Sequence, residues 1–274
     1  MATLKEMARS RALKLGHMIF EFATPGIGHL CRNAGAEFVI LDMEHSAFGF
    51  ETIKQTIRYV EAAGLPVIVR TPSREYHHIA RACDVGADGL MLPMVGNAEQ
   101  ARQIIDSVKY HPLGHRGVAV GIAHDRYRPA TPAQMLAAAN AHTALFLQIE
   151  TTEGVENADA IAALPEVDCL WVGHFDLSCS LGIPGAFEDR RFLAAIETVR
   201  RACARHGKSL GRLVPDAATG AALYRDGFDF QSYSGDLWVF QTALAAGIAA
   251  LRQAAERTAA ERTAAERTAA ERTA

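Results

Sequence analysis

Short apolar runs alternate with amphipathic stretches along most of this chain. The apolar runs are rich in β-branched residues and are bounded by turn residues, a pattern typical of strands that are buried on both faces. Eight such runs cover residues 16–22, 38–43, 67–71, 89–94, 144–150, 169–173, 209–214 and 228–233. The pattern therefore predicts eight short strands that lie inside the protein.

The stretches between these runs have the spacing of helices. In residues 51–63, 98–108 and 192–206, apolar side chains recur every three or four positions, which predicts helices with one buried face. Glycine is favoured just after the end of a helix. Five glycines stand shortly before a predicted strand: Gly35, Gly64, Gly86, Gly207 and Gly227. We therefore expect each of them to end a helix.

Eight strand-then-helix units within about 250 residues are typical of a (β/α)₈ TIM barrel, the α/β fold that we predict for residues 1–253 as a single domain. The alternative is an open, doubly wound sheet. That fold often binds a dinucleotide through a G-x-G-x-x-G motif after its first strand, and the chain has none there. The barrel is the better interpretation.

Two segments depart from this repeating pattern. Residues 110–129 form a long connection rich in Gly, His and Arg, which we interpret as a substrate lid, a subunit contact or a solvated insertion. Residues 254–274 repeat the sequence Ala-Ala-Glu-Arg-Thr. A five-residue period advances about 140° around a helix, so no face stays apolar. We expect this tail to be an exposed, frayed helix or a disordered segment without chemistry.

The composition excludes several classes of protein. The formal net charge is −3 and there is no basic stripe, so we expect no nucleic-acid partner. The apolar runs are far shorter than the roughly 20 residues that span a bilayer, so we expect no membrane partner. The N-terminus lacks the apolar segment of a signal peptide. Five widely spaced cysteines without a C-x-x-C motif favour a reduced, cytoplasmic compartment.

The candidate chemistry lies where the predicted strands end. In a barrel, the carboxyl ends of the strands form the face that carries the active site. The second strand ends in two acids and a histidine, the third in an arginine, the fifth in a glutamine and an acid, and the sixth in a histidine and an acid. These residues are Asp42, Glu44, His45, Arg70, Gln148, Glu150, His174 and Asp176.

Two of these acids suggest a metal site. Glu150 and Asp176 would repel each other across a pocket unless a cation lay between them, and carboxylate oxygens suit Mg²⁺ or Mn²⁺. The alternative is an ion-pair network with Arg70 and no metal. If His174 were a third ligand, Co²⁺ or Zn²⁺ would be favoured, but successive positions at a strand end point to opposite sides.

A metal at this place would suit a 2-oxo acid substrate. The ion would chelate the carboxylate and ketone oxygens and stabilise the enolate that forms when a C3 proton leaves. Arg70 would place a permanent positive charge beside the enolate oxygen, and His45 would transfer the proton. A Schiff-base lysine is the alternative mechanism. None of the five lysines follows a predicted strand, which disfavours that mechanism.

At these residues the chain resembles the HpcH/HpaI family of class II, metal-dependent pyruvate aldolases. The matching segments are 41–46, 69–70, 89–95, 148–151, 172–173 and 176–178, in order within residues 16–250. The resemblance implies aldol cleavage of a 4-hydroxy-2-oxo acid into pyruvate or hydroxypyruvate and an aldehyde. It also implies a homo-hexamer in which the last helix packs onto a neighbouring subunit.

The resemblance also implies roles for individual residues. Glu150 and Asp176 would hold the metal, with Gln148 on a metal-bound water, while Arg70 stabilises the enolate and His45 acts as acid and base. Asp42 joins Arg70 and His45 in the candidate catalytic group. The backbone of Gly173, His174, Phe175 and Asp176 would bind the pyruvate carboxylate. Asp84 would support a histidine, and its place at the far end of a helix points to the His45 of another subunit.

The chain departs from the family pattern in two places. His174 stands where a proline is usual, and residues 121–127 differ from the family's loop, so the aldehyde specificity stays open. Two alternative functions also stay open. One is an acyl-CoA lyase of the wider citrate lyase β and malyl-CoA superfamily, and the other is a barrel that binds a 2-oxo acid without catalysis.

Overall fold

The computed structural model describes residues 2–273, and the chain divides into two compact units between Gly235 and Asp236. We expected the boundary at 253/254, where the repeats begin. The contacts divide the chain where the helix that contains the repeats starts, at Asp236, and the domain boundary at 253/254 stays a prediction.

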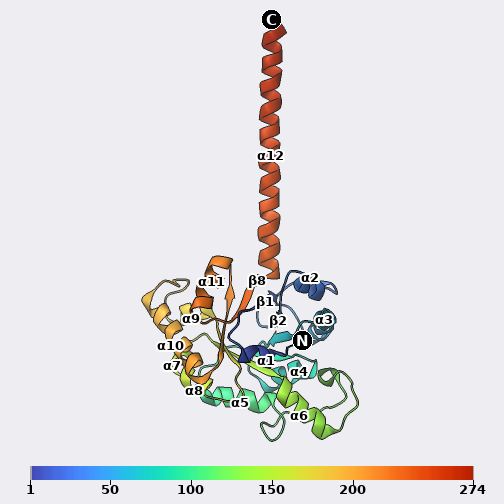
Figure 1. The fold of residues 1–274 in the computed structure, drawn as a ribbon, viewed down its shortest axis with the longest axis vertical. Coiled ribbons are helices and arrows are strands. Elements are labelled where there is room, and N and C mark those ends of the chain that lie inside the picture. Colours follow the sequence, from blue (N-terminus) through green and yellow to red (C-terminus); the bar gives the residue numbers. More distant parts are fainter. Residues whose placement is uncertain (1, 274) are drawn as a thin grey trace. The chain divides into compact units, whose positions relative to one another are not determined.

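The first unit is a closed barrel of eight parallel strands in the order of the sequence (Figure 1). The strands are β1 Lys14–Ile19, β2 Phe38–Asp42, β3 Val67–Arg70, β4 Gly89–Leu92, β5 Ala144–Ile149, β6 Cys169–Val172, β7 Ser209–Val214 and β8 Phe230–Gly235. The predicted (β/α)₈ barrel is confirmed. Most strands end one to three residues before the prediction, and β8 ends two residues after it.

Helices surround this barrel (Figure 1). They are α1 Leu4–Arg9, α2 Ile27–Asn33, α3 Phe50–Ala62, α4 Tyr76–Asp84, α5 Ala98–Val108, the short η1 Ala123–Asp125, α6 Pro132–His142, α7 Thr152–Glu156, α8 Ala158–Ala162, α9 His174–Ser180, α10 Arg190–His206 and α11 Ala217–Arg225. The five glycines predicted to end helices all have a positive φ, between 63° and 103°, which confirms that prediction.

The alternation of side chains along each strand determines what faces the barrel interior. Phe230 contacts Phe38 and Phe146 from two other strands, with ring centroids 5.3 and 5.2 Å apart, so these rings fill the interior. Val39 and Leu147, one position on from such inward residues, pack into the core between barrel and helices. Inward positions continue along β2 and β5 to Asp42 and Gln148. The polar strand ends therefore point into the mouth of the barrel.

The long connection 110–129 lies between α5 and α6 and leads through α6 into the start of β5. Loops that precede strands lie at the amino-terminal face of a barrel, opposite the face that carries active sites. The lid interpretation is therefore wrong for the chain's own catalytic face. Of our original alternatives, a subunit contact or a solvated insertion remains.

The second unit is one helix, α12 Asp236–Thr273. Leu244, Ile248 and Leu251 recur at helical spacing in its first half. In the repeats, the hydroxyls of Thr258, Thr263 and Thr268 each donate to the carbonyl four residues earlier. We expected the tail to be either an exposed helix or a disordered segment. The structure shows a helix that continues to Thr273, and Ala274 lies outside the described residues. No helix within residues 2–273 is long and apolar enough to cross a membrane.

Candidate active site

Asp42 organises the end of β2 and joins it to β3. It is fully buried, and its carboxylate accepts hydrogen bonds from the backbone N–H groups of Glu44 and His45, both at 3.0 Å. The Nε of Arg70 donates to Asp42 at 2.6 Å, and an Arg70 terminal nitrogen lies 3.1 Å from Glu44 Oε2. Because two carboxylates hold the guanidinium, its charge is fixed at the mouth of the barrel.

Glu44 and His45 lie beside this pair but differ in exposure. Burial raises the pKa of Glu44, and the negative charges of Asp42 and Asp176 add to this, while Arg70 opposes it. The His45 side chain is 59% exposed, and its Nε2 lies 3.9 Å from Glu44 Oε2. The imidazole is therefore free to exchange protons with solvent or with a substrate above the rim.

Glu150 follows β5 and is almost completely buried. Its carboxylate accepts hydrogen bonds from the backbone N–H of Met94 at 2.5 Å and from the side-chain amide of Gln148 at 2.9 Å. Burial raises the pKa of Glu150 to about 7, with help from the charges of Glu44 and Asp176 and against the Met94 hydrogen bond. Within residues 2–273, the carboxylate is thus positioned without a cationic side chain in an ion pair with it.

The turn after β6 completes the group. Gly173 packs so closely on the Glu150 carboxylate that a Cβ at this position would overlap it. Asp176 lies in the first turn of α9, and its charge acts on both Glu44 and Glu150. The structure therefore brings Asp42, Arg70, Glu150 and Asp176 to one end of the barrel.

The side chains of His174 and Phe175, in the same turn, differ in their exposure to solvent. His174 is 8% exposed and packs against the rings of Phe175 and Phe187, at 4.5 and 5.2 Å between centroids. Burial lowers the pKa of His174 to about 3, and the nearby charge of Arg212 lowers it further. Phe175 is 61% exposed. The imidazole of His174 is thus neutral and packs among aromatic rings, and within residues 2–273 it forms no three-ligand cluster with Glu150 and Asp176, so the structure gives no support for His174 as a metal ligand.

Asp84 does not join this group within the chain. It is the last residue of α4, next to the amino-terminal face of the barrel, and it accepts a hydrogen bond from Arg116. The predicted contact with a His45 therefore needs a second copy of the chain, as the sequence indicated.

The donor set fits a divalent cation. The side-chain oxygen of Gln148 is buried and has no hydrogen-bond partner within the described residues, so it can accept from a bound water. Glu150 and Asp176 carry carboxylate oxygens, the donors that hard divalent cations prefer. Within residues 2–273, no three His, Cys, Asp or Glu side chains form a metal cluster. Water and substrate oxygens would have to complete the coordination.

Two residues of the site were not assigned a role from the sequence: Met94 was not predicted at all, and Glu44 was identified only as an acid at a strand end. Met94 supplies the N–H that holds Glu150, and it does so with φ 56°, a conformation uncommon for a residue other than glycine. No sequence pattern signals that backbone. Glu44 was visible as an acid at the end of β2, but its contact with Arg70 depends on the fold.

Comparison with known proteins identifies the family of the chain. The family model described as HpcH/HpaI aldolase/citrate lyase matches residues 20–264. A 5-keto-4-deoxy-D-glucarate aldolase from Shigella boydii is 33% identical over 210 residues, which cover 77% of this chain and 81% of that protein. A hydroxypyruvate/pyruvate aldolase from Chromohalobacter salexigens is 33% identical over 234 residues, covering 85% and 87%.

A solved structure agrees in fold. The crystal structure of an HpcH/HpaI aldolase from Desulfitobacterium hafniense matches with a TM-score of 0.86 and 33% identity, over 92% of this chain and 97% of that one. Aldolases are carbon–carbon lyases, so the comparisons confirm the predicted reaction class. By its sequence match, its barrel and its rim of strand ends, the chain belongs to the HpcH/HpaI aldolase/citrate lyase family.

Proposed function

We propose that this protein is a metal-dependent aldolase that cleaves a 4-hydroxy-2-oxo acid reversibly into pyruvate or hydroxypyruvate and an aldehyde. Both relatives are named aldolases, and one is named for hydroxypyruvate and pyruvate. The observation that carries the proposal is that Glu150 is buried near the negative charge of Asp176, while its carboxylate forms no ion pair with any described residue.

Glu150 and Asp176 would hold Mg²⁺ or Mn²⁺, with Gln148 accepting a hydrogen bond from a coordinated water. When bound, the ion supplies a Lewis acid for the carboxylate and ketone oxygens of the oxo acid. The backbone from Gly173 to Asp176 would then bind the substrate carboxylate. The side chain of His174 takes no part, because it packs against Phe175 and Phe187.

Arg70 stabilises the charge that develops on the ketone oxygen during cleavage. Its guanidinium is held by Asp42 and Glu44 before substrate arrives, so little reorganisation is needed in the transition state. His45 receives the proton of the 4-hydroxyl group during cleavage and returns it in the reverse reaction. Its exposed ring and its backbone bond to Asp42 suit this role.

The test is exchange of the methyl protons of pyruvate in D₂O, followed by NMR, because it needs no knowledge of the aldehyde. We expect exchange with Mg²⁺ or Mn²⁺, loss of exchange after chelation and recovery when metal is returned. Full exchange by the chelated protein would contradict the metal-dependent mechanism. Binding of pyruvate without any exchange would favour a barrel that only binds the oxo acid.

We also propose that the protein works as a cytoplasmic homo-hexamer in which α12 packs on another copy. Leu244, Ile248 and Leu251 give the first half of α12 an apolar stripe that a second copy would cover. Asp84 would then support the His45 of a neighbouring subunit. Light scattering of the purified chain tests the assembly, and a monomer with full activity would contradict it.

A further inference from the structure

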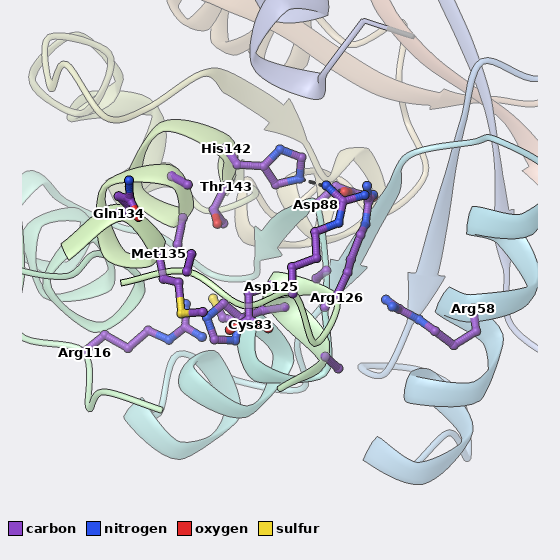
Figure 2. Close-up of a pocket in the computed structure, with 18 residues that line it drawn as sticks. Arg58, Cys83, Asp88, Arg116, Asp125, Arg126, Gln134, Met135, His142 and Thr143 are labelled. Atoms are coloured by element: carbon purple, nitrogen blue, oxygen red, sulfur yellow. Dashed lines mark hydrogen bonds and ion pairs between the residues drawn. The ribbon is translucent and has the colours of Figure 1, made fainter. Parts of the chain in front are cut away.

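A cavity lies at the opposite end of the barrel from the candidate active site. It has a volume of about 620 Å³, opens to solvent, and is lined by Arg58 of α3, the end of α4 with the turn before β4, residues 116–130 and α6 (Figure 2). Both Asp88 and Thr143, which line it, precede strands, so the cavity belongs to the amino-terminal face. Its volume is within the range of small-molecule sites.

The carboxylates near this cavity already have hydrogen-bond partners. Asp88 accepts from the backbone N–H of Val67 at 2.8 Å and lies 2.7 Å from the ring of His142, the contact drawn in Figure 2. Asp125 accepts from two backbone N–H groups of its own loop. Asp84 accepts from Arg116. Little acceptor capacity is left on the wall.

The donors are less well satisfied. The Nε atoms of Arg58 and Arg116 and both ring nitrogens of His124 are buried without hydrogen-bond partners in the described chain. Arg128 also lines the cavity and forms no ion pair with any described residue.

The shared carboxylate of Glu61 adds to this excess of donors over acceptors. Arg58 and Arg126 both pair with Glu61, so one acid serves two guanidinium groups at the edge of the cavity. A buried donor without a partner costs free energy, and an arginine fork matches the oxygens of a carboxylate or a phosphate. The unused capacity of the wall is therefore mainly capacity to donate to an anion.

We propose that this cavity binds a small oxyanion, a metabolite that carries a carboxylate or a phosphate group, at the end of the barrel opposite the chain's own Glu150 and Asp176. Arg128 and Arg58 would bind the charged oxygens. His124 would add one N–H donor, because neither of its buried ring nitrogens has a hydrogen-bond partner within the described residues. Ala138 and Met135 of α6 would contact the apolar part of the ligand.

The experiment is calorimetric titration of the full-length, metal-loaded protein with two probes, inorganic phosphate and malonate. The more strongly bound probe identifies the phosphate or the carboxylate as the preferred group. We expect Arg128→Gln to weaken that binding about tenfold or more, since a charge-assisted hydrogen bond is lost, and Arg58→Gln to act in the same direction. Arg225→Gln, at an exposed arginine of α11 outside the cavity, is the matched control and should leave binding unchanged.

A third variant separates this site from the active site. In Glu150→Gln, binding of the preferred probe should persist, because Glu150 lies at the other end of the barrel. The proposal is overturned if neither probe binds, if both cavity variants bind as the wild type does, or if Glu150→Gln abolishes binding. Thermal unfolding of each variant verifies that the barrel is intact.

Discussion

In the part of the chain that the structure describes, the two ends of the barrel differ in which charged groups lack partners: carboxylates without an ion pair at the carboxyl end, and arginine donors at the amino end. At the carboxyl end, Glu150 and Asp176 lie close enough to act on each other, and neither is in an ion pair within the described residues. At the amino end, Asp84 and Asp88 are satisfied and the arginines keep unused donors. The difference shows that unused hydrogen-bonding capacity, rather than net charge, indicates which ligand each end can take. We therefore propose a cation site at the carboxyl end and an anion site at the amino end.

The largest expected effect is at the carboxyl end. Glu150→Gln keeps the shape of the side chain and removes one anionic ligand, so we expect kcat/KM for cleavage to fall by roughly 10³-fold or more. The assay measures pyruvate released from a 4-hydroxy-2-oxo acid. Glu188→Gln, at an exposed acid before α10, is the control. If Glu150→Gln kept a kcat/KM near the wild-type value, the proposal that the carboxyl end binds a catalytic cation would be contradicted.

Arg70→Lys tests whether the fixed guanidinium matters beyond its charge. Lysine keeps the charge but cannot bridge Asp42 and Glu44 as the fork does. We expect kcat to fall by about 10²-fold with a smaller change in KM, because the interaction is strongest in the transition state. Steady-state kinetics measure both constants. An unchanged kcat would mean that charge alone is sufficient.

Lys109 offers a pH test at the amino end. It is 1% exposed and donates to the carbonyls of Asn140 and Thr143, and burial lowers its pKa to about 8. Between pH 8 and the ordinary value of 10.5, the unfolded chain binds more protons than the folded one, so stability contributed by this group rises with pH.

Between pH 8 and 10.5, we expect this lysine to change the free energy of unfolding by up to about 3 kcal/mol. Urea unfolding of wild type and Lys109→Met from pH 7.5 to 10.5 measures it, and the wild type should gain stability relative to the variant as pH rises. Parallel curves would show that burial does not disfavour the charged form of this lysine.

The smallest effect is expected from the repeats. Deleting residues 254–274 removes no residue of the rim and none of the cavity, so kcat/KM and anion binding should each stay within about twofold of the wild type. Light scattering on the same sample shows whether assembly is kept. A large loss of either function would mean that the tail takes part in one of the two ends.

The sequence was sufficient for the barrel because its signals are local. Strand runs, helical spacing and the five helix-ending glycines each act within a few residues, and the strand ends that carry Asp42, Arg70 and Glu150 follow from them. The hydrogen bond from Met94 to Glu150 depends on a left-handed residue that no motif marks. The amino-terminal cavity depends on how residues 116–130 pack on α6, which sequence periodicity does not describe.

The central claim is that Glu150 and Asp176 together hold one divalent cation. Calorimetric titration of the metal-free protein with Mn²⁺ tests it most directly, in wild type, Glu150→Gln and Asp176→Asn. We predict one ion per chain for the wild type and at least tenfold weaker binding in each variant, with the fold retained. Equal Mn²⁺ affinity in all three proteins would contradict the claim.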